Sequence, residues 1–465
     1  MHRRSLLAGA AALTAGAAIP VSARRAGRQP PALPVEVPQP NTGIRFDPRA
    51  FGAVGDGTAK DTVAIQRALD RCAVMGGGEV VLAGGTFLTG AVRIGSNTTL
   101  RVERDAVLQG SPDVADYPIV QVRWEGRWVP GHGALVWAQD AENVRLTGEG
   151  RIVASTAIPG RIAASGLRNP ALIEFVAVRG LAVTGLTTQQ NDMWSIHPVY
   201  CEDVRFLDLT VHGGADGIDV DSCRRVSIRR CTFDTADDCI SLKSGRGMEG
   251  ATIARPTEDV TISDCKFRDR RWACIGIGSE TSGGIRRVLI ERCHFVAAHT
   301  FSIYIKSRPG RGAFIENITM RDLDASGAGD GFLRLNFLDS GKQDTFPVAG
   351  AVGIPTVRDI VCERIRVSDV PVLVEATNLH PDKPLEGFFF RDVHGTAGSG
   401  MRIANVRGAV IERVDVQIAA GPKLAIANVS GRGLEGAVPL AAPATPQPVI
   451  PAATPYQLGM TSPLG

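Results

Sequence analysis

The segments Cys201-Glu-Asp-Val-Arg-Phe206 and Cys223-Arg-Arg-Val-Ser-Ile228 decide the fold, because they are one short pattern repeated after 22 residues. Polar and apolar residues alternate in each, as in a strand with one buried face. The same pattern returns in four further segments: Thr257-Glu-Asp-Val-Thr-Ile262, Ile285-Arg-Arg-Val-Leu-Ile290, Val357-Arg-Asp-Ile360 and Val406-Arg-Gly-Ala-Val-Ile411. Units this short cannot bury their own apolar face, so neighbouring copies have to stack.

The spacing of these segments predicts an all-β protein, a parallel β-helix. The shortest interval is 22 residues, and longer intervals carry loops such as residues 245–256. Short strands, turns at fixed places and loops of variable length are typical of this architecture. The alternative is a propeller or a sandwich, which would need longer strands joined by tight Asn-Gly or Asp-Gly turns. The pattern does not supply such turns.

An N-terminal helix is expected to close the open end of the stack. Residues 61–74 have helical spacing of Val63, Ile65, Leu69 and Cys72, and they end before three consecutive glycines at 76–78. A helix at this place would cover an otherwise exposed strand edge.

The nine cysteines are interpreted as buried thiols stacked in the core. Cys231, Cys265 and Cys293 each follow the repeated valine by five residues, and no Cys-x-x-Cys pair suggests zinc. The odd number leaves at least one thiol unpaired, and one disulfide stays an alternative. The nine are Cys72, Cys201, Cys223, Cys231, Cys239, Cys265, Cys274, Cys293 and Cys362.

The termini predict an exported protein. Arg3-Arg4, an apolar run and Val21-Ser22-Ala23 resemble a twin-arginine signal peptide over residues 1–23, with a general secretory signal or an uncleaved anchor as alternatives. A linker over residues 24–41, the β-helix over 42–436 and a weakly packed Pro- and Ala-rich tail over 437–465 would follow. We expect a periplasmic or secreted bacterial protein, free of the membrane after cleavage.

The charge balance excludes nucleic acid as a partner. The whole chain has 51 basic and 48 acidic residues, and the signal would remove two arginines. No basic run remains, so any attraction for a polyanion has to be local. We expect a monomer.

Three aspartates are the candidate catalytic residues. Asp216 and Asp238 are 22 residues apart, so they should lie on adjacent turns of the stack, and Asp237 precedes the second. Carboxylates this close raise the pKa of at least one of them. An acid beside a carboxylate is what glycoside hydrolysis needs. A calcium site or a solvated acidic turn is the alternative.

The aspartates lie in Ala215-Asp-Gly-Ile-Asp-Val-Asp-Ser222 and Thr235-Ala-Asp-Asp-Cys-Ile-Ser-Leu-Lys-Ser-Gly245, which resemble the polygalacturonase family of pectin glycoside hydrolases, bacterial branch. The resemblance covers roughly residues 46–413. Further similar segments are Phe51-Gly-Ala-Val-Gly-Asp-Gly57, Arg123-Trp-Glu-Gly126, Trp194-Ser-Ile-His-Pro-Val199, Gly278-Ser-Glu-Thr-Ser-Gly-Gly284, Ile305-Lys306 and Gly310-Arg-Gly312.

This resemblance implies a right-handed β-helix and an inverting hydrolase of acidic plant cell-wall polysaccharide, without metal or cofactor. Asp237 would be the general acid, and Asp216 and Asp238 would hold and activate water. Lys306 would pair with a substrate carboxylate.

The sequence departs from the family at three positions near the aspartates. The family's Asn, His and Arg are replaced by Ala215, Trp272 and Tyr304. The loss of an arginine removes a carboxylate clamp, so we expect an altered substrate pocket around Trp272 and Tyr304. Rhamnogalacturonan or another substituted pectin is an alternative substrate. A lyase or epimerase, a non-catalytic carbohydrate-binding β-helix and an inactive relative also stay open.

Three further residues are candidates for substrate binding, each with a structural alternative. Trp194 would stack against a sugar or pack at a corner of the fold. Lys243 would belong to a basic column with Lys306 or neutralise a nearby aspartate. Arg311 would replace the missing family arginine or hold a surface loop.

Overall fold

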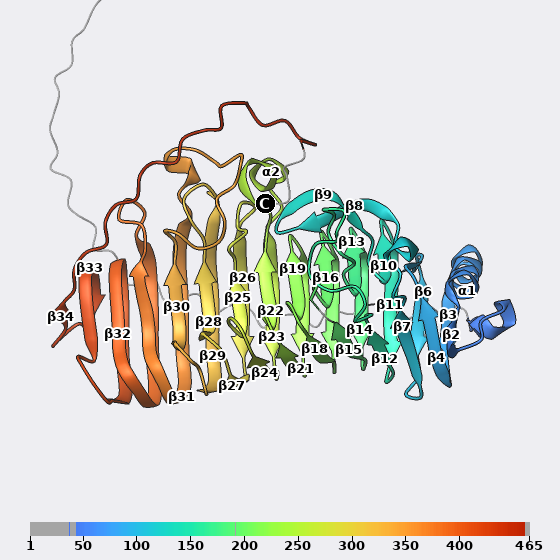
Figure 1. Ribbon diagram of the computed structural model, residues 1–465. Helices are drawn as coiled ribbons and strands as arrows, with labels where there is room; N and C mark the ends of the chain where they lie inside the picture. Colours follow the sequence, from blue (N-terminus) through green and yellow to red (C-terminus); the bar gives the residue numbers. More distant parts are fainter. Residues whose placement is uncertain (1–36, 38–42, 191, 461–465) are drawn as a thin grey trace, which may run out of the picture. The chain divides into compact units, whose positions relative to one another are not determined.

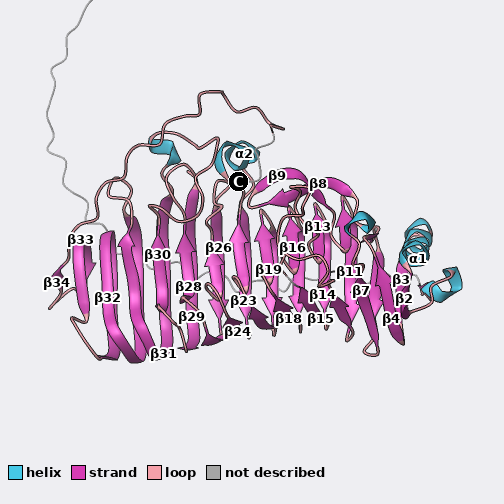
Figure 2. Ribbon diagram, in the orientation of Figure 1, coloured by secondary structure: helices cyan, strands magenta, loops and turns pink. Residues whose placement is uncertain are grey.

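The computed structural model describes Val37, residues 43–190 and residues 192–460. Its strands pair in parallel, turn after turn, in a right-handed β-helix (Figures 1 and 2). The predicted fold is confirmed. The predicted signal peptide lies outside the described residues, as does the predicted linker apart from Val37.

The repeated segments form one column of stacked strands. Val204 pairs with Val226, Val226 with Val260, and Val260 with Val288, so the repeated valine holds the same place in every turn. The column begins with β1 (Arg45–Phe46), β3 (Gly78–Leu82), β6 (Thr98–Val102), β11 (Glu142–Gly148), β14 (Arg179–Thr184), β17 (Glu202–Leu207), β20 (Arg224–Arg229), β23 (Thr257–Ser263) and β26 (Ile285–Glu291).

Two more columns complete each turn. The second holds β2 (Asp56–Lys60), β4 (Gly85–Thr89), β7 (Ala106–Gly110), β12 (Arg151–Val153), β15 (Thr187–Gln190), β18 (Thr210–Gly213), β21 (Thr232–Thr235), β24 (Lys266–Asp269) and β27 (His294–Ala297). The third holds β5 (Val92–Arg93), β10 (Val136–Gln139), β13 (Ile173–Val176), β16 (Ile196–Val199), β19 (Ile218–Asp221), β22 (Ile240–Lys243), β25 (Ile275–Ile277), β28 (Phe301–Lys306) and β30 (Gly331–Asn336).

The C-terminal turns are built from long continuous strands. These are β29 (Phe314–Ser326), β31 (Thr356–Asn378), β32 (Leu385–Ile418) and β33 (Leu424–Arg432), followed by the short β34 (Val438–Pro439). The strands therefore continue just past residue 436. The tail beyond them is largely exposed, but Val449 accepts a hydrogen bond from Gly350 at 3.0 Å, and Tyr456 packs on Phe346.

Loops and an antiparallel hairpin project from the stack. The hairpin is β8 (Ile119–Trp124) with β9 (Arg127–His132), and α2 (Gly247–Ile253) lies in the loop after β22. Figure 1 shows the hairpin, α2 and the loop after β30 on the same side of the strands. Short 3-10 helices occur at η1 (Pro48–Phe51), η2 (Val114–Asp116) and η3 (Ala351–Gly353).

The predicted terminal helix is confirmed as α1 (Thr62–Val74). Ile65, Leu69 and Cys72 are fully buried, together with Ala68. Val63 is 61% exposed, so its expected place on the buried face is wrong. The alanines, whose small side chains carry little hydrophobic signal, complete that face instead.

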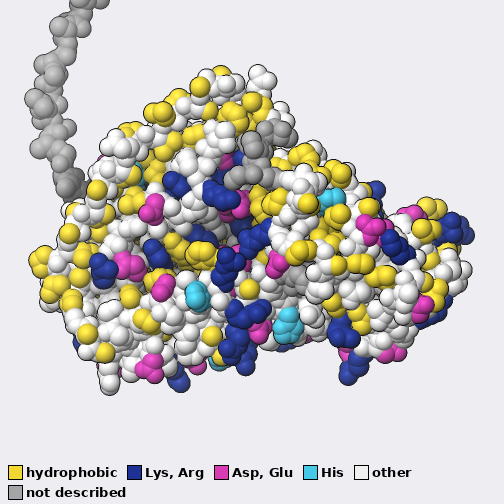
Figure 3. All heavy atoms as spheres, viewed as in Figure 1, with side chains coloured by type: hydrophobic (Ala, Val, Ile, Leu, Met, Phe, Trp, Pro, Cys, Tyr) yellow, Lys and Arg dark blue, Asp and Glu magenta, His cyan; other side chains and the backbone are white. Residues whose placement is uncertain are grey.

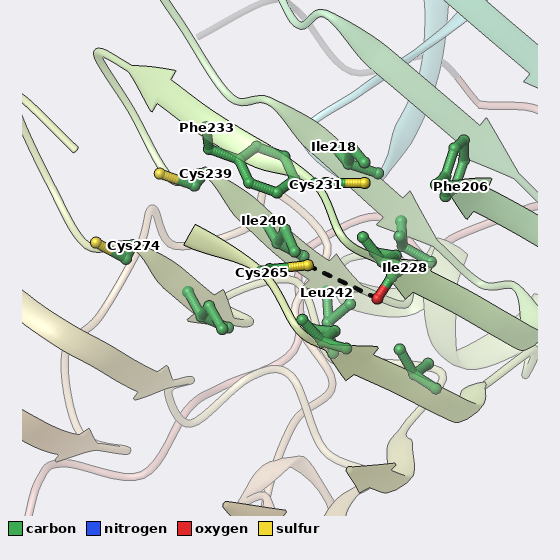
Figure 4. Close-up of a cluster of buried hydrophobic side chains, with 14 of the residues drawn as sticks. Phe206, Ile218, Ile228, Cys231, Phe233, Cys239, Ile240, Leu242, Cys265 and Cys274 are labelled. Atoms are coloured by element: carbon green, nitrogen blue, oxygen red, sulfur yellow. Dashed lines mark hydrogen bonds between the residues drawn. The ribbon is translucent and has the colours of Figure 1, made fainter. Parts of the chain in front are cut away.

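The core is a ladder of like side chains. Phe233, Phe267 and Phe295 stack with ring centroids 5.2 and 5.1 Å apart. Figure 4 shows Cys231 and Cys265 among the neighbouring isoleucines, and Cys265 donates to the carbonyl of Ile228. All nine cysteines are buried free thiols, so the disulfide alternative is not realised.

No helix within the described ranges is long and apolar enough to span a bilayer.

Ion pairs tie successive turns together outside the core. Asp203 and Arg225 have left-handed backbones with φ of 57° and 55°, and their side chains pair at 2.6 Å. Asp259 and Arg287 repeat the arrangement at 2.6 Å, 28 residues apart. Left-handed conformations disfavour most side chains, so each turn carries a small strain beside a charge pair that joins it to the next turn.

Truncation of the central ring of the phenylalanine ladder tests the stacking. We expect Phe267→Ala to lower the free energy of unfolding by about 3–5 kcal/mol, because a cavity opens between two rings that cannot close on it. Guanidinium denaturation followed by circular dichroism measures the change. Val63→Ala, on the exposed face of α1, is the control and should change it by less than about 0.5 kcal/mol. Equal effects of the two substitutions would contradict the ladder.

Candidate active site

A cleft of about 470 Å³ opens over the third column of strands. Figure 3 shows acidic and basic side chains gathered beside one another below α2, in the middle of the face in view. The residues that line the cleft are Glu125, Arg161, Trp194, Asp216, Asp237, Asp238, Lys243, Trp272, Gly278, Ser279, Glu280, Tyr304, Lys306, Asn336, Asp339, Ser340, Gly341 and Lys342.

The three candidate aspartates lie together in this cleft. Gly217 N–H donates to the Asp238 carbonyl at 3.0 Å, and Ile218 pairs with Ile240, so Asp216 lies beside Asp238 on adjacent turns. Asp237 Oδ1 accepts the backbone N–H of Asp238 at 3.0 Å. The 22-residue offset in the sequence therefore corresponds to a real juxtaposition of carboxylates.

Burial and mutual repulsion change the acidity of this group. Burial, reinforced by the charge of Asp237, raises the pKa of Asp216 well above its usual range. Burial also raises the pKa of Asp238, and the ammonium of Lys306 offsets only part of that effect. The cleft thus makes Asp216 and Asp238 weaker acids than exposed aspartates.

Lysines neutralise the remaining carboxylate charge. Lys243 Nζ lies 2.7 Å from Asp219 and 3.3 Å from Asp216, and Lys306 Nζ lies 2.9 Å from Asp238. Strand pairing puts both lysines in one row of the third column, on either side of Gly278. The predicted basic column therefore exists, but its members are engaged with aspartates.

Trp194 does not form the expected open platform. It is 2% exposed, stacks on Trp124 at 5.4 Å and meets His197 edge-on at 4.7 Å. The ammonium of Lys243 lies 4.7 Å from its ring centroid. Trp194 borders the cleft, but its neighbours cover the ring, so the structure favours the alternative of a packed tryptophan over a sugar-stacking residue.

Trp272 and Tyr304 line the cleft, where the family's His and Arg were expected from the resemblance. Trp272 is 46% exposed, which leaves ring surface free for a ligand. The Tyr304 hydroxyl bonds to Ser340 Oγ at 3.1 Å. Neither side chain carries charge, so these two positions present surface and a hydroxyl rather than a cation.

Arg311 lies behind the wall of the cleft and not in it. Its side chain is fully buried and donates to the carbonyls of Ser279 at 3.0 Å and Lys342 at 2.6 Å. Burial lowers the pKa of Arg311 to about 10. The prediction that it binds substrate is wrong; Arg311 holds the two loops that border the site.

Arg161 and Glu125 are two of the charged cleft residues that the sequence analysis missed; the others are Glu280, Asp339 and Lys342. Arg161, in the loop between β12 and β13, contacts Asp237 Oδ2 at 2.5 Å. Glu125, at the tip of the β8–β9 hairpin, contacts Arg246 at 3.0 Å and Lys342 at 3.7 Å. Both lie in loops outside the repeat, so no periodic signal marks them. The Arg-Trp-Glu-Gly segment was the only available hint for Glu125.

A buried network supports the floor of the site. Glu174 of β13 accepts from Arg168 at 2.7 Å and lies 3.2 Å from His197 Nδ1. Burial alone would raise the pKa of Glu174, but Arg168 and His197 outweigh it and lower the pKa to about 2. His197 is thus a structural residue of the floor.

The low pKa of Glu174 predicts an acid-sensitive contribution to stability. An unfolded glutamate has a pKa of about 4.3, so folding is favoured by ionised Glu174 above that pH, and this contribution is lost as the pH falls towards 2. The free energy of unfolding of the wild-type protein should exceed that of Glu174→Gln by about 3 kcal/mol at pH 7. The difference should shrink below pH ~4.3 in denaturation measured across pH.

Glu149→Gln is the matched control for this measurement, because the Glu149 side chain is 60% exposed. The small difference in the free energy of unfolding between Glu149→Gln and wild type should not vary with pH in the same way. A Glu174→Gln difference that stays constant from pH 7 to pH 2 would contradict the role of the network.

Known proteins of similar sequence include polygalacturonases. A probable polygalacturonase of Vitis vinifera is 30% identical over 291 residues, which cover 59% of this chain and 59% of the relative. The chain thus spans less than two thirds of that relative's length.

Solved structures share the fold. The exopolygalacturonase from Thermotoga maritima superposes with a TM-score of 0.64 at 23% identity, covering 82% of this chain and 94% of that one. The family 28 exopolygalacturonase of Yersinia enterocolitica superposes with a TM-score of 0.69 at 19% identity, covering 84% of this chain and 78% of that one. The sequence model of the glycosyl hydrolases family 28 matches residues 82–407, which is more than half of the chain. The chain belongs to the glycosyl hydrolases family 28.

Proposed function

We propose that the protein is an inverting glycoside hydrolase that cleaves pectin-type acidic polysaccharide. The observation that carries the proposal is the trio Asp216, Asp237 and Asp238 in one cleft, with two carboxyls of raised pKa. Family membership supports the same reaction. The predicted signal and the polymeric substrate support action outside the cytoplasm.

The three aspartates are assigned different roles. Asp237 has the most exposed side chain, at 15% against 6% for Asp216 and 4% for Asp238, which suits a general acid that must reach the leaving oxygen. Asp216 and Asp238, side by side, hold a water molecule, and one of them removes its proton as it attacks the anomeric carbon. Lys243 and Lys306 help to keep charge on this pair.

The sugar-binding surface supports a substrate other than plain unsubstituted polymer. Trp272 offers an open ring beside the aspartates, and Tyr304 offers a hydroxyl. An aromatic face packs against the C–H groups of a sugar ring, independently of the sugar's charge. Rhamnogalacturonan and xylose-substituted galacturonan are therefore substrates to be compared with polygalacturonate.

Removal of the general acid tests the proposed chemistry. We expect Asp237→Asn to lower kcat by about 10³-fold, while far-ultraviolet circular dichroism stays unchanged. Products from polygalacturonate, rhamnogalacturonan and xylogalacturonan are analysed in parallel with a chelator present. Nuclear magnetic resonance of the first product should show the inverted anomer.

Asp234→Asn is the control, because Asp234 is a partly exposed aspartate that pairs with Arg270 outside the cleft. Its activity should equal that of wild type. An unsaturated product would show that the protein is a lyase and not a hydrolase. Binding without turnover would favour a carbohydrate-binding solenoid. Near-normal turnover by Asp237→Asn would refute the assignment of the acid.

Trp272→Ala tests the open ring as a binding platform. We expect KM to rise about tenfold, which corresponds to a loss of about 1.4 kcal/mol of binding, with kcat changed less. Stability should fall little, since the ring is 46% exposed. Trp272→Phe should recover most of the affinity. Unchanged KM on all three polymers would show that the ring does not contact the substrate.

A further inference from the structure

Arg161 holds the proposed general acid. Its guanidinium lies 2.5 Å from Asp237 Oδ2, and the side chain is 33% exposed. A guanidinium pairs with a carboxylate through two parallel donors, and it does so equally well with a carboxylate of the protein or of a ligand. The contact with Asp237 therefore occupies a group that could bind an acidic sugar.

We propose that Arg161 is the specificity-determining residue of the cleft: it leaves Asp237 to bind the carboxylate of an incoming uronate. The inference rests on the proposed function. Its consequence is that an acidic sugar frees the general acid, whereas a neutral ester of the same sugar does not.

The charges of the cleft support this role. The lining side chains include six carboxylates and four cations, Arg161, Lys243, Lys306 and Lys342. A polyanionic substrate needs one of the cations to be available. Lys243 and Lys306 are only 9% and 18% exposed and are held by aspartates of the floor.

Between the two more exposed cations, Arg161 is the one at the reaction centre. Lys342 contacts Glu125 at 3.7 Å, at the rim. Arg161 contacts Asp237 itself, and the charge of Asp216 also acts on it. Arg161 alone carries the planar fork that fits a carboxylate in two-point contact. With Tyr304 at the position of the family arginine, Arg161 supplies a guanidinium to the same cleft from the loop between β12 and β13.

The loop of Arg161 is built to hold the backbone while the side chain stays free to change partner. Asn169 N–H donates to the Arg161 carbonyl at 2.9 Å. The Asn169 side chain donates to the carbonyls of Pro159 and Gly160 at 3.0 Å each. Movement of Arg161 from Asp237 to a ligand therefore needs side-chain rotation and no rearrangement of the loop.

The exchange of partners frees the Asp237 carboxyl for the proton transfer that hydrolysis needs. Asp237 gives its proton to the leaving glycosidic oxygen as the bond between that oxygen and the anomeric carbon breaks. The water held by Asp216 and Asp238 forms the new bond to the anomeric carbon and passes its proton to one of these two carboxylates. Release of that proton to solvent and uptake of a proton by Asp237 complete the cycle, so protons and charge balance.

The test compares polygalacturonate with its highly methyl-esterified form. We expect Arg161→Gln to lower kcat/KM on polygalacturonate about 100-fold and not to lower kcat/KM on the ester, because Asp237 is no longer held by the guanidinium. Arg161→Lys, which keeps the charge but loses the fork, should lie between, at about tenfold.

The control is Arg230→Gln, which removes a guanidinium of a surface pair with Asp208 at 2.7 Å outside the cleft. It should leave kcat/KM on both substrates unchanged. An equal loss of kcat/KM on both substrates would overturn the proposal and leave Arg161 with a purely structural role.

Binding of galacturonate and of its methyl ester, measured by calorimetry, separates the two proposals. Wild type should prefer the acid, and Arg161→Gln should lose this preference. Asp237→Asn should bind the acid more tightly than wild type, because the guanidinium is released. Arg161-dependent binding without any hydrolysis would refute the proposed function alone, whereas hydrolysis with an Arg161-independent preference would refute this inference alone.

Discussion

The stacking of each turn on its neighbour is the constraint on which the structure depends. A strand of four to seven residues buries its apolar face only because the next turn presents the same pattern at the same height, as the valines at 204, 226, 260 and 288 do. The register that aligns these valines also aligns every polar residue between them. Chemistry at the surface is therefore placed by the same pairing that builds the core.

This coupling explains why the cleft is so crowded with charge. Asp216 and Asp238 are held together by backbone pairing, and neither can move away to relieve repulsion. The fold supplies Lys243 and Lys306 from the same column as partial compensation. Burial, together with the remaining charge imbalance, raises the pKa values of Asp216 and Asp238, which hydrolytic chemistry uses.

The features that the sequence could predict are those that the periodic repeat determines. The β-helix, the stacked thiols, the terminal helix and the adjacency of the aspartates all depend on residues inside the repeat. Arg161 and Glu125 escaped prediction because they reach the cleft from loops whose lengths follow no period. Trp194 and Arg311 were misplaced for a related reason: the sequence indicates which residues lie near a site, but not whether another side chain already covers them, as Trp124 covers Trp194.

The aspartate–arginine pairs on the outside of the stacked turns have a consequence for how the loops of this fold can vary. The pair Asp203–Arg225 joins turns separated by 22 residues, and Asp259–Arg287 joins turns separated by 28, with the same contact distance. The extra residues of the longer turn are accommodated elsewhere in that turn, so the geometry of the ion pair does not depend on their number. The ion pairs thus keep neighbouring turns aligned whatever the number of residues between them. Loops that shape the cleft can lengthen, shorten or be exchanged between relatives while the scaffold beneath keeps its register, so new specificities are open to selection at little structural risk.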